Sequence, residues 1–162
     1  MITIGGKVKE ILIYTDGACA NNQSKNNTGG YGAILIYNGK EKEIYDGFKN
    51  TTNNRMELKA VIEALKLLKR QDIPIKIFSD SAYVVNGITK WIDNWIAKGS
   101  VKKNPDLWME LYNLKKKFKD ITFYKVKGHN GDKYNEIADK LAVKGANMLD
   151  LKEDIEDVNV RF

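Results

Sequence analysis

The fold is decided by residues 11–17, whose sequence is Ile11-Leu12-Ile13-Tyr14-Thr15-Asp16-Gly17. Five apolar, aromatic or β-branched residues in succession predict a short strand that is buried on both faces. We expect this strand to end at Asp16-Gly17, because aspartate and glycine favour turns. The stretch therefore predicts a central strand of a sheet with an acidic residue just beyond its carboxyl end.

Two more strands are expected directly downstream. Residues 29–37 return to strand character, and Asn38-Gly39 is the dipeptide most typical of a tight hairpin turn. The second arm, at about residues 41–48, alternates less cleanly, as does an outer strand with one solvent-exposed face. These segments predict a three-stranded antiparallel meander.

Helices and strands alternate in the rest of the chain. Leu58, Val61, Ile62, Leu65 and Leu68 have the three-and-four spacing of a helix with one buried stripe. Crossovers through helices return the chain in the same direction, so the predicted α/β fold is a mixed sheet with parallel central strands. The expected elements are a helix at 54–70, a strand at 74–79, helical segments at 81–95, a helix at 106–118, a strand at 121–126 and a closing helix whose packing face runs from 137 to 145.

Charge is unevenly distributed along the chain. Five acidic and two basic residues give 150–162 a net charge of −3, so the total of +6 leaves +9 on residues 1–149. A basic body suits a polyanionic partner, although many basic proteins have no specific one. We expect one domain at 1–149, which has the size and hydrophobic content for one core, and a flexible, frayed acidic tail at 150–162.

Several protein classes are excluded by what the sequence lacks. Cys19 is the only cysteine, so neither an internal disulfide nor a thiolate zinc site can form. No apolar stretch approaches the roughly 20 residues that cross a membrane, and the first residues lack a signal-peptide pattern. A cytoplasmic protein without a membrane partner is expected.

Four acids stand out by position: Asp16, Glu57 in the first turn of the long helix, Asp80 after the fourth strand, and Asp139 in the last helix. Each also has an ordinary structural interpretation. Asp16 and Asp80 suit turns or helix caps, and Asn54 with Glu57 has the spacing of a capping box. The acids gain significance only as a group.

Topology brings these acids toward one place. Asp16 and Asp80 each follow a central strand, where ligand crevices form in open α/β sheets. Glu57 and Asp139 border the packing faces of their helices. Carboxylates gathered in a partly buried crevice repel one another unless they bind protons or cations, and oxygen ligands select Mg²⁺ or Mn²⁺. A pair of such ions supports phosphoryl transfer.

The same residues belong to a series of motifs that resembles the signature of type 1 ribonuclease H. The similarity spans about Lys9 to Leu149. The motifs occur in that family's order and are Thr15-Asp16-Gly17-Ala18-Cys19, Gly29-Gly30-Tyr31-Gly32-Ala33, Thr52-Asn53-Asn54-Arg55-Met56-Glu57-Leu58, Ser79-Asp80-Ser81, Gly128-His129-Asn130-Gly131 and Asn135-Glu136 with Asp139.

This resemblance implies a five-stranded mixed sheet with helices on both faces. It also implies that Asp16, Glu57, Asp80 and Asp139 are the ligands of two Mg²⁺ ions, for which Mn²⁺ can substitute. The implied activity is endonucleolytic hydrolysis of the RNA strand of RNA/DNA hybrids by a monomer, leaving 3′-hydroxyl and 5′-phosphate ends.

Substrate contacts are implied at the start of the long helix. Asn22, Asn53 and Asn54 are expected near the RNA strand, where amides hydrogen-bond 2′-hydroxyl groups. Thr52 and Arg55 are expected to hold a phosphate of the DNA strand. For Arg55, the alternative is an ordinary exposed residue of the first turn.

The resemblance also assigns a histidine and a basic segment. His129, the only histidine, corresponds to a mobile residue that assists proton transfer or product departure, and glycine neighbours suit that role. The alternative is an ordinary exposed loop residue. Lys90, Trp91 and Trp95 resemble a basic protrusion that grips the hybrid. The alternative is that the tryptophans are packing residues and the lysines a solvated face.

Two other functional classes remain open from sequence. The first is a non-catalytic module that binds RNA/DNA hybrids with the same fold, since a fold alone does not establish activity. The second is a recombinase or transposase core, which usually carries extra domains that do not fit in 162 residues. The four acids favour the nuclease.

Overall fold

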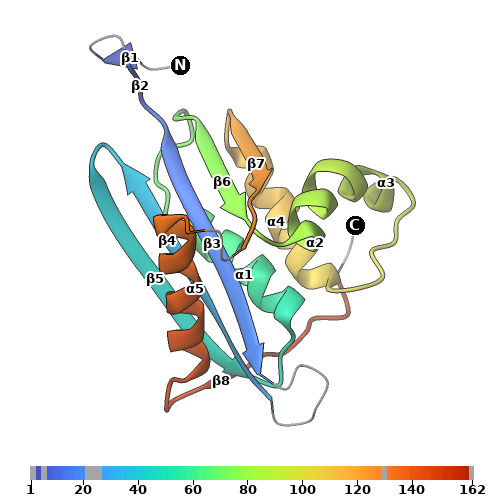
Figure 1. The fold of residues 1–162 in the computed structure, drawn as a ribbon. Helices are drawn as coiled ribbons and strands as arrows, with labels where there is room; N and C mark the ends of the chain where they lie inside the picture. The colour runs from blue at the N-terminus through green and yellow to red at the C-terminus, as the bar shows by residue number, and fades with distance from the viewer. Residues whose placement is uncertain (1–2, 5–6, 21–26, 129–130, 161–162) are drawn as a thin grey trace.

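The computed structural model describes residues 3–4, 7–20, 27–128 and 131–160. Its main sheet has the strand order β7-β6-β3-β4-β5-β8, and β1 and β2 form a separate two-stranded sheet near the N-terminus (Figure 1). The strands are β1 (Thr3–Ile4), β2 (Lys7–Val8), β3 (Ile11–Ala20), β4 (Thr28–Tyr37), β5 (Lys40–Lys49), β6 (Ile75–Ser79), β7 (Ile121–Lys125) and β8 (Lys152–Glu153).

The strand pairing confirms the predicted mixed sheet. β3, β4 and β5 form the antiparallel meander, and β6 and β7 add to β3 in parallel. Asn38 and Gly39 join β4 to β5 with φ values of 54° and 77°. Two consecutive left-handed residues fit the twist of a tight hairpin, which explains the Asn-Gly sequence.

β3 is longer than predicted. It continues through Asp16 and Gly17 to Ala20, with Asp16 opposite Gly32 and Ala20 opposite Thr28 of β4. The turn preference of Asp-Gly is overridden because β4 supplies hydrogen-bonding partners along the whole length. Asp16 therefore lies within a strand, where the ladder fixes its backbone.

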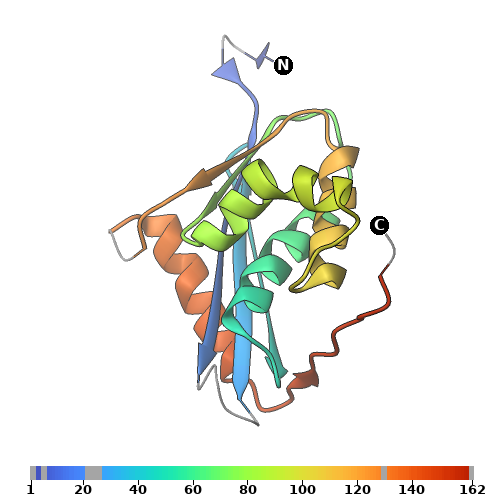
Figure 2. The ribbon, with the colours of Figure 1, turned by 90° about the vertical axis from the view of Figure 1, so that its right-hand side faces the viewer.

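Helices cover both faces of the sheet. α5 packs on β3, β4 and β5 from one side, while α1 and α4 lie on the other (Figures 1 and 2). The helices are α1 (Asn53–Lys66), α2 (Ala82–Asn86), the π-helical turn η1 (Gly87–Trp91), α3 (Ile92–Ala97), α4 (Pro105–Lys117) and α5 (Lys133–Ala146). No helix in the described ranges is long and apolar enough to cross a membrane.

α1 is the predicted long helix, and its stripe from Leu58 to Leu65 is buried in the core. It ends at Lys66, four residues earlier than expected. The N–H groups of Leu67 and Leu68 donate to the carbonyls three residues back, at 3.2 and 3.1 Å, which tightens and closes the last turn.

α5 lies unusually close to the sheet because glycines face it. A Cβ on Gly30 of β4 would lie 2.3 Å from the carbonyl oxygen of Ala142, and one on Gly145 would lie 2.1 Å from that of Asp46. Both distances are far shorter than any real contact, so larger residues would push the helix outward. Close packing brings Asp139 of α5 down onto the sheet.

The structure differs from expectation at the C-terminal tail. We expected residues 150–162 to be frayed, but β8 pairs in parallel with the end of β5 through Phe48↔Lys152 and Lys49↔Glu153. Asp154 continues the pairing, since its N–H donates to the carbonyl of Lys49 at 3.2 Å. The main sheet thus has a sixth short strand, held by contacts that lie about a hundred residues apart in sequence.

Candidate active site

Three of the four predicted acids meet in space. One carboxylate oxygen from each of Asp16, Glu57 and Asp80 lies within 4.8 Å of those from the other two. Asp16 comes from β3, Glu57 from α1, and Asp80 from the residue directly after β6. The parallel pairing of β3 and β6 places Asp16 level with Asp80 at the carboxyl end of β6, so the two aspartates lie side by side as the topology predicted.

Glu57 points into this cluster and does not cap its helix. The cap of α1 is Thr52, whose hydroxyl accepts from the Arg55 N–H at 3.2 Å. One Glu57 carboxylate oxygen accepts instead from the N–H of Gly17 on β3. The capping-box alternative is therefore wrong, because the helix begins two residues earlier than that spacing required.

Gly17 permits this contact because it has no side chain. A Cβ at this position would lie 2.5 Å from the backbone nitrogen of Glu57. The close approach of β3 and α1 leaves the second carboxylate oxygen, Oε2, buried without a hydrogen-bond partner among the described residues. Buried polar atoms are almost always paired, so an orphaned carboxylate oxygen is a candidate ligand atom.

Asp80 is also free of a capping role. Ser81 caps α2, since its hydroxyl accepts from the Val84 N–H at 3.2 Å, and its own N–H donates to Ser79 Oγ at 3.1 Å. The segment after β7 reaches the same carboxylate, because a Cβ on Gly128 would lie 2.9 Å from Asp80 Oδ2.

Asp139 approaches from α5 and lies outside the three-residue group. It still borders the site, because the interaction with its carboxyl group contributes to the raised pKa of Asp16. The structure thus brings three of the predicted ligands within reach of one ion and places the fourth against one of them.

The electrostatics of the cluster follow from its burial. Burial, together with the charge of Asp80 and the interaction with the Asp139 carboxyl group, raises the pKa of Asp16 to about 7. Burial and the neighbouring Asp16 also raise the pKa of Glu57 well above its ordinary value. Without a cation these acids retain protons that isolated carboxylates would lose.

A hard divalent cation fits this donor set. All candidate ligand atoms are carboxylate oxygens, which Mg²⁺ and Mn²⁺ prefer. The orphaned Glu57 Oε2 and the raised pKa values of Asp16 and Glu57 indicate that the site lacks positive charge from the protein itself.

The predicted substrate contacts at the start of α1 lie on the surface. Thr52, Asn53 and Asn54 are exposed. They line one wall of a polar cavity of about 520 Å³, which is completed by Lys102, Lys103, Asn104 and Glu156. Asn22 and His129 lie outside the described residues.

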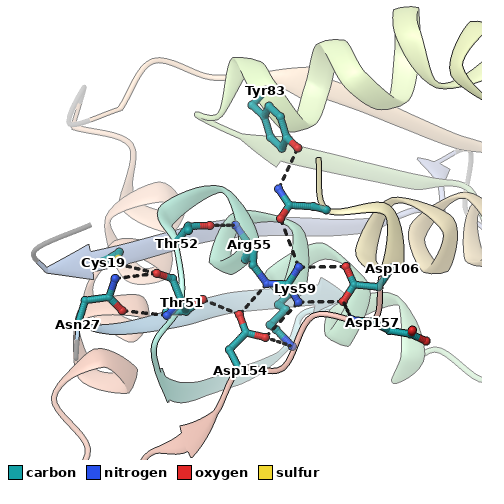
Figure 3. A network of polar contacts seen from close by, with 11 residues as sticks. Cys19, Asn27, Thr51, Thr52, Arg55, Lys59, Tyr83, Asp106, Asp154 and Asp157 are labelled. Atoms are coloured by element: carbon teal, nitrogen blue, oxygen red, sulfur yellow. Dashed lines mark hydrogen bonds and ion pairs between the residues drawn. The ribbon is translucent and has the colours of Figure 1, made fainter. Parts of the chain in front are cut away.

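Arg55 is not the ordinary exposed residue of the alternative interpretation. It is 5% exposed, and its guanidinium group binds Asp106 at 2.9 Å and Asp154 at 2.8 Å (Figure 3). Thr51 donates to the same Asp154 carboxylate at 2.7 Å. We did not identify Asp106 and Asp154 from sequence, because no local pattern links them to Arg55.

The two tryptophans of the basic segment have different surroundings. Trp91 is 43% exposed, whereas Trp95 is partly buried and meets Trp108 edge-on at 5.4 Å. Lys90 is exposed beside Trp91, and Lys98 lines a mostly apolar cavity of about 520 Å³ with Trp95. Trp95 therefore has the packing role that the alternative proposed, while Trp91 is available at the surface.

Comparison with known proteins agrees with these observations. The RNase H family model matches residues 8–147. A ribonuclease H of Hahella chejuensis is 51% identical over 144 residues, covering 85% of this chain and 94% of the relative. A ribonuclease H of Clostridium botulinum is 49% identical over 142 residues, covering 83% and 94%.

A solved structure shows the same relationship. LC9-RNase H1, described as a type 1 RNase H with the type 2 active-site motif, superposes with a TM-score of 0.77 at 30% identity. The match covers 86% of this chain and 73% of that one. The fold, the motifs and these relatives together show that the chain belongs to the ribonuclease H family.

Proposed function

We propose that this protein hydrolyses the RNA strand of RNA/DNA hybrids with magnesium as its cofactor, leaving 3′-hydroxyl and 5′-phosphate ends. The observation that carries the proposal is the group of Asp16 and Glu57, which are buried, and Asp80, which is partly buried. One carboxylate oxygen from each lies within 4.8 Å of the others, and among the described residues no lysine or arginine pairs with them. The net charge of +9 on residues 1–149 supports a polyanionic substrate.

Four carboxylates would hold the metal: Asp16, Glu57, Asp80 and Asp139. When bound, two magnesium ions supply the charge that activates a water and stabilises the leaving oxygen, and manganese would serve as a substitute. The protein's own contribution is to fix the ligands. The β3–β4 ladder holds Asp16, and the Gly17 N–H orients Glu57.

His129 is proposed to assist proton transfer or product departure. The support is its neighbour Gly128, where an added Cβ would lie 2.9 Å from Asp80 Oδ2. Glycine neighbours in the sequence suit a residue with such a role.

Substrate recognition is proposed for the surface beside the cluster. The amides of Asn22, Asn53 and Asn54 would hydrogen-bond the 2′-hydroxyl groups that distinguish RNA from DNA. Thr52 would contact a phosphate of the DNA strand, and Lys90 and Trp91 would grip the hybrid further away, with Trp95 packed beside Trp91. The contacts of Arg55 with Asp106 and Asp154 favour a supporting role beneath this surface over a direct phosphate contact.

The decisive experiment incubates the protein with a labelled RNA/DNA duplex, with Mg²⁺ or with EDTA, beside RNA/RNA and DNA/DNA duplexes of the same sequence. We expect cleavage of the RNA strand in the hybrid alone, only with the metal, and 5′-phosphate ends on the products. Hybrid binding without cleavage at any Mg²⁺ or Mn²⁺ concentration would favour the non-catalytic module. Strand joining or cleavage of DNA/DNA would favour the recombinase class.

The cellular setting stays a prediction. We propose a cytoplasmic monomer. The cytoplasmic location is supported by Cys19, which is the only cysteine, so that no disulfide can form within the chain. Gel filtration with light scattering checks the monomer.

A further inference from the structure

The docked tail crosses the start of two helices next to the proposed substrate surface. After β8, Asp154 lies with its side chain only 1% exposed and accepts from Arg55 Nε at 2.8 Å (Figure 3). Three residues later, the Asp157 N–H donates to Asp106 Oδ2 at 3.2 Å, at the first turn of α4. The tail is therefore pinned on both sides of Glu156.

This arrangement places Glu156 at a cavity. Glu156 lines the polar cavity of about 520 Å³ that lies between the starts of α1 and α4. The rest of the wall is built from neutral hydrogen-bonding groups and two cations, namely Thr52, Asn53, Asn54, Asn104, Lys102 and Lys103. Apart from Glu156, this is the chemistry that binds a backbone phosphate.

The charge of Glu156 is not neutralised locally. Among the described residues, no lysine or arginine lies within 4.0 Å of its carboxylate. Asp154 differs, because Arg55 and Lys59 compensate it at 2.8 and 3.5 Å. Of the tail acids, Glu156 alone combines an unpaired charge with a position on the cavity wall.

We propose that Glu156 is an affinity-determining residue of the substrate surface. Held at the cavity by the docked tail, its carboxylate repels a phosphate of the hybrid backbone and so opposes the attraction of Lys102 and Lys103. The proposal rests on the proposed function, since it takes an RNA/DNA hybrid as the ligand. Its consequence is faster release of bound hybrid, because weaker binding within one interface mostly raises the dissociation rate.

The test measures hybrid binding by the full chain in EDTA, which prevents cleavage, over a range of salt concentrations. Glu156→Gln removes the charge with little change in shape, and Asp150→Asn is the matched control, because Asp150 is an exposed tail acid that does not line the cavity. We expect Glu156→Gln to bind about three-fold more tightly at low salt, and the gain to disappear at high salt as screening removes the repulsion.

Glu156→Lys extends the series and is expected to bind about ten-fold more tightly at low salt, since it replaces repulsion with attraction. With Mg²⁺ present, Glu156→Gln should lower KM while kcat stays equal or falls through slower product release. Asp150→Asn should match the wild type.

Three outcomes would overturn the inference. Glu156→Gln with wild-type affinity would do so, as would a gain that is independent of salt or one that Asp150→Asn shares. A wild-type protein that binds and cuts the hybrid while Glu156→Gln behaves identically leaves the proposed function intact and removes only the role of Glu156. A wild-type protein that does not bind the hybrid removes both.

Discussion

Two groups of buried and partly buried acids border the first turn of α1 and differ in how their charge is balanced. In one group, Arg55 binds Asp106 and Asp154. Although burial opposes ionisation, hydrogen bonds from Arg55 hold the pKa of both aspartates below its usual value. Two residues further along, Glu57 meets Asp16 and Asp80 with no lysine or arginine paired to them among the described residues, and burial raises the pKa of Glu57 and Asp16.

The presence or absence of a paired cation distinguishes an acid that stabilises the fold from an acid that is available to bind a metal ion. Where the chain supplies the cation, the carboxylates are ionised, hydrogen-bonded and fixed, which is the state of a structural network. Where the chain supplies no cation, the carboxylates repel one another and retain protons until a cation from solution binds. Burial alone does not distinguish the two groups, whereas the sign of the pKa shift does.

The largest expected effect tests the group without a cation. Asp80→Asn should lower hybrid cleavage about 10³-fold or more, because a ligand that helps to supply several kcal/mol of charge stabilisation is lost. Hybrid binding should change little, and the free energy of unfolding in EDTA should not fall, since a charge that repels Asp16 and Glu57 has gone. Cleavage kinetics and urea unfolding measure these quantities.

Asp120→Asn is the control for this change, because Asp120 is exposed and outside the cluster. Cleavage by Asp80→Asn at the wild-type rate, over a range of Mg²⁺ concentrations, would contradict the metal assignment.

The next effect tests the group with a cation. Arg55→Met should lower the free energy of unfolding by about 3 kcal/mol, because it leaves the partly buried Asp106 without its ion-pair partner and Asp154 with Lys59 alone. The control is Arg70→Met, which breaks an exposed pair with Asp72 and should have no measurable effect. Urea unfolding at neutral pH measures both variants. An equal loss of unfolding free energy in both would show that the Arg55 network stabilises the fold no more than an exposed ion pair does.

A smaller effect should distinguish the two groups by the pH dependence of the free energy of unfolding. Because the folded-state pKa of Asp16 is raised from 3.8 to about 7, the native state binds more protons than the unfolded state in that interval. In EDTA the free energy of unfolding should therefore fall by about 2 kcal/mol as the pH rises from 5 to 8. Asp106 and Asp154 act oppositely, since their lowered pKa values give stability above about pH 4 that is lost on further acidification.

Magnesium should flatten the slope between pH 5 and 8, because the ion takes the place of the protons, and Asp16→Asn should flatten it without magnesium. Urea unfolding at four pH values provides the measurement. A metal-free wild-type protein that becomes more stable from pH 5 to 8 would show that the cluster does not carry these shifts.

Sequence reasoning identified the site through periodicity and topology. Strand and helix patterns placed Asp16 and Asp80 at adjacent strands and Glu57 on an inward row of its helix, and the structure brings these three together. This succeeded because buried stripes and crossovers are encoded locally, within windows of about 10–20 residues.

The missed features depend on contacts between distant residues. Arg55 and Asp154 are 99 residues apart, and nothing near either residue indicates their pairing. The extension of β3 depends in the same way on β4, whose hydrogen bonds override the turn preference of Asp16-Gly17. The family resemblance gave the expected ligands their roles, but it could not reveal that the tail pairs with β5.

The short length of β8 has a consequence for self-association. β8 covers only Phe48 and Lys49, so in the part of the chain that the structure describes the remaining outer edge of β5 has no neighbouring strand. That edge begins with the exposed, alternately charged run Lys40-Glu41-Lys42-Glu43. A second copy adding there would have to desolvate these charges, so the edge resists the strand-to-strand growth that leads to aggregates.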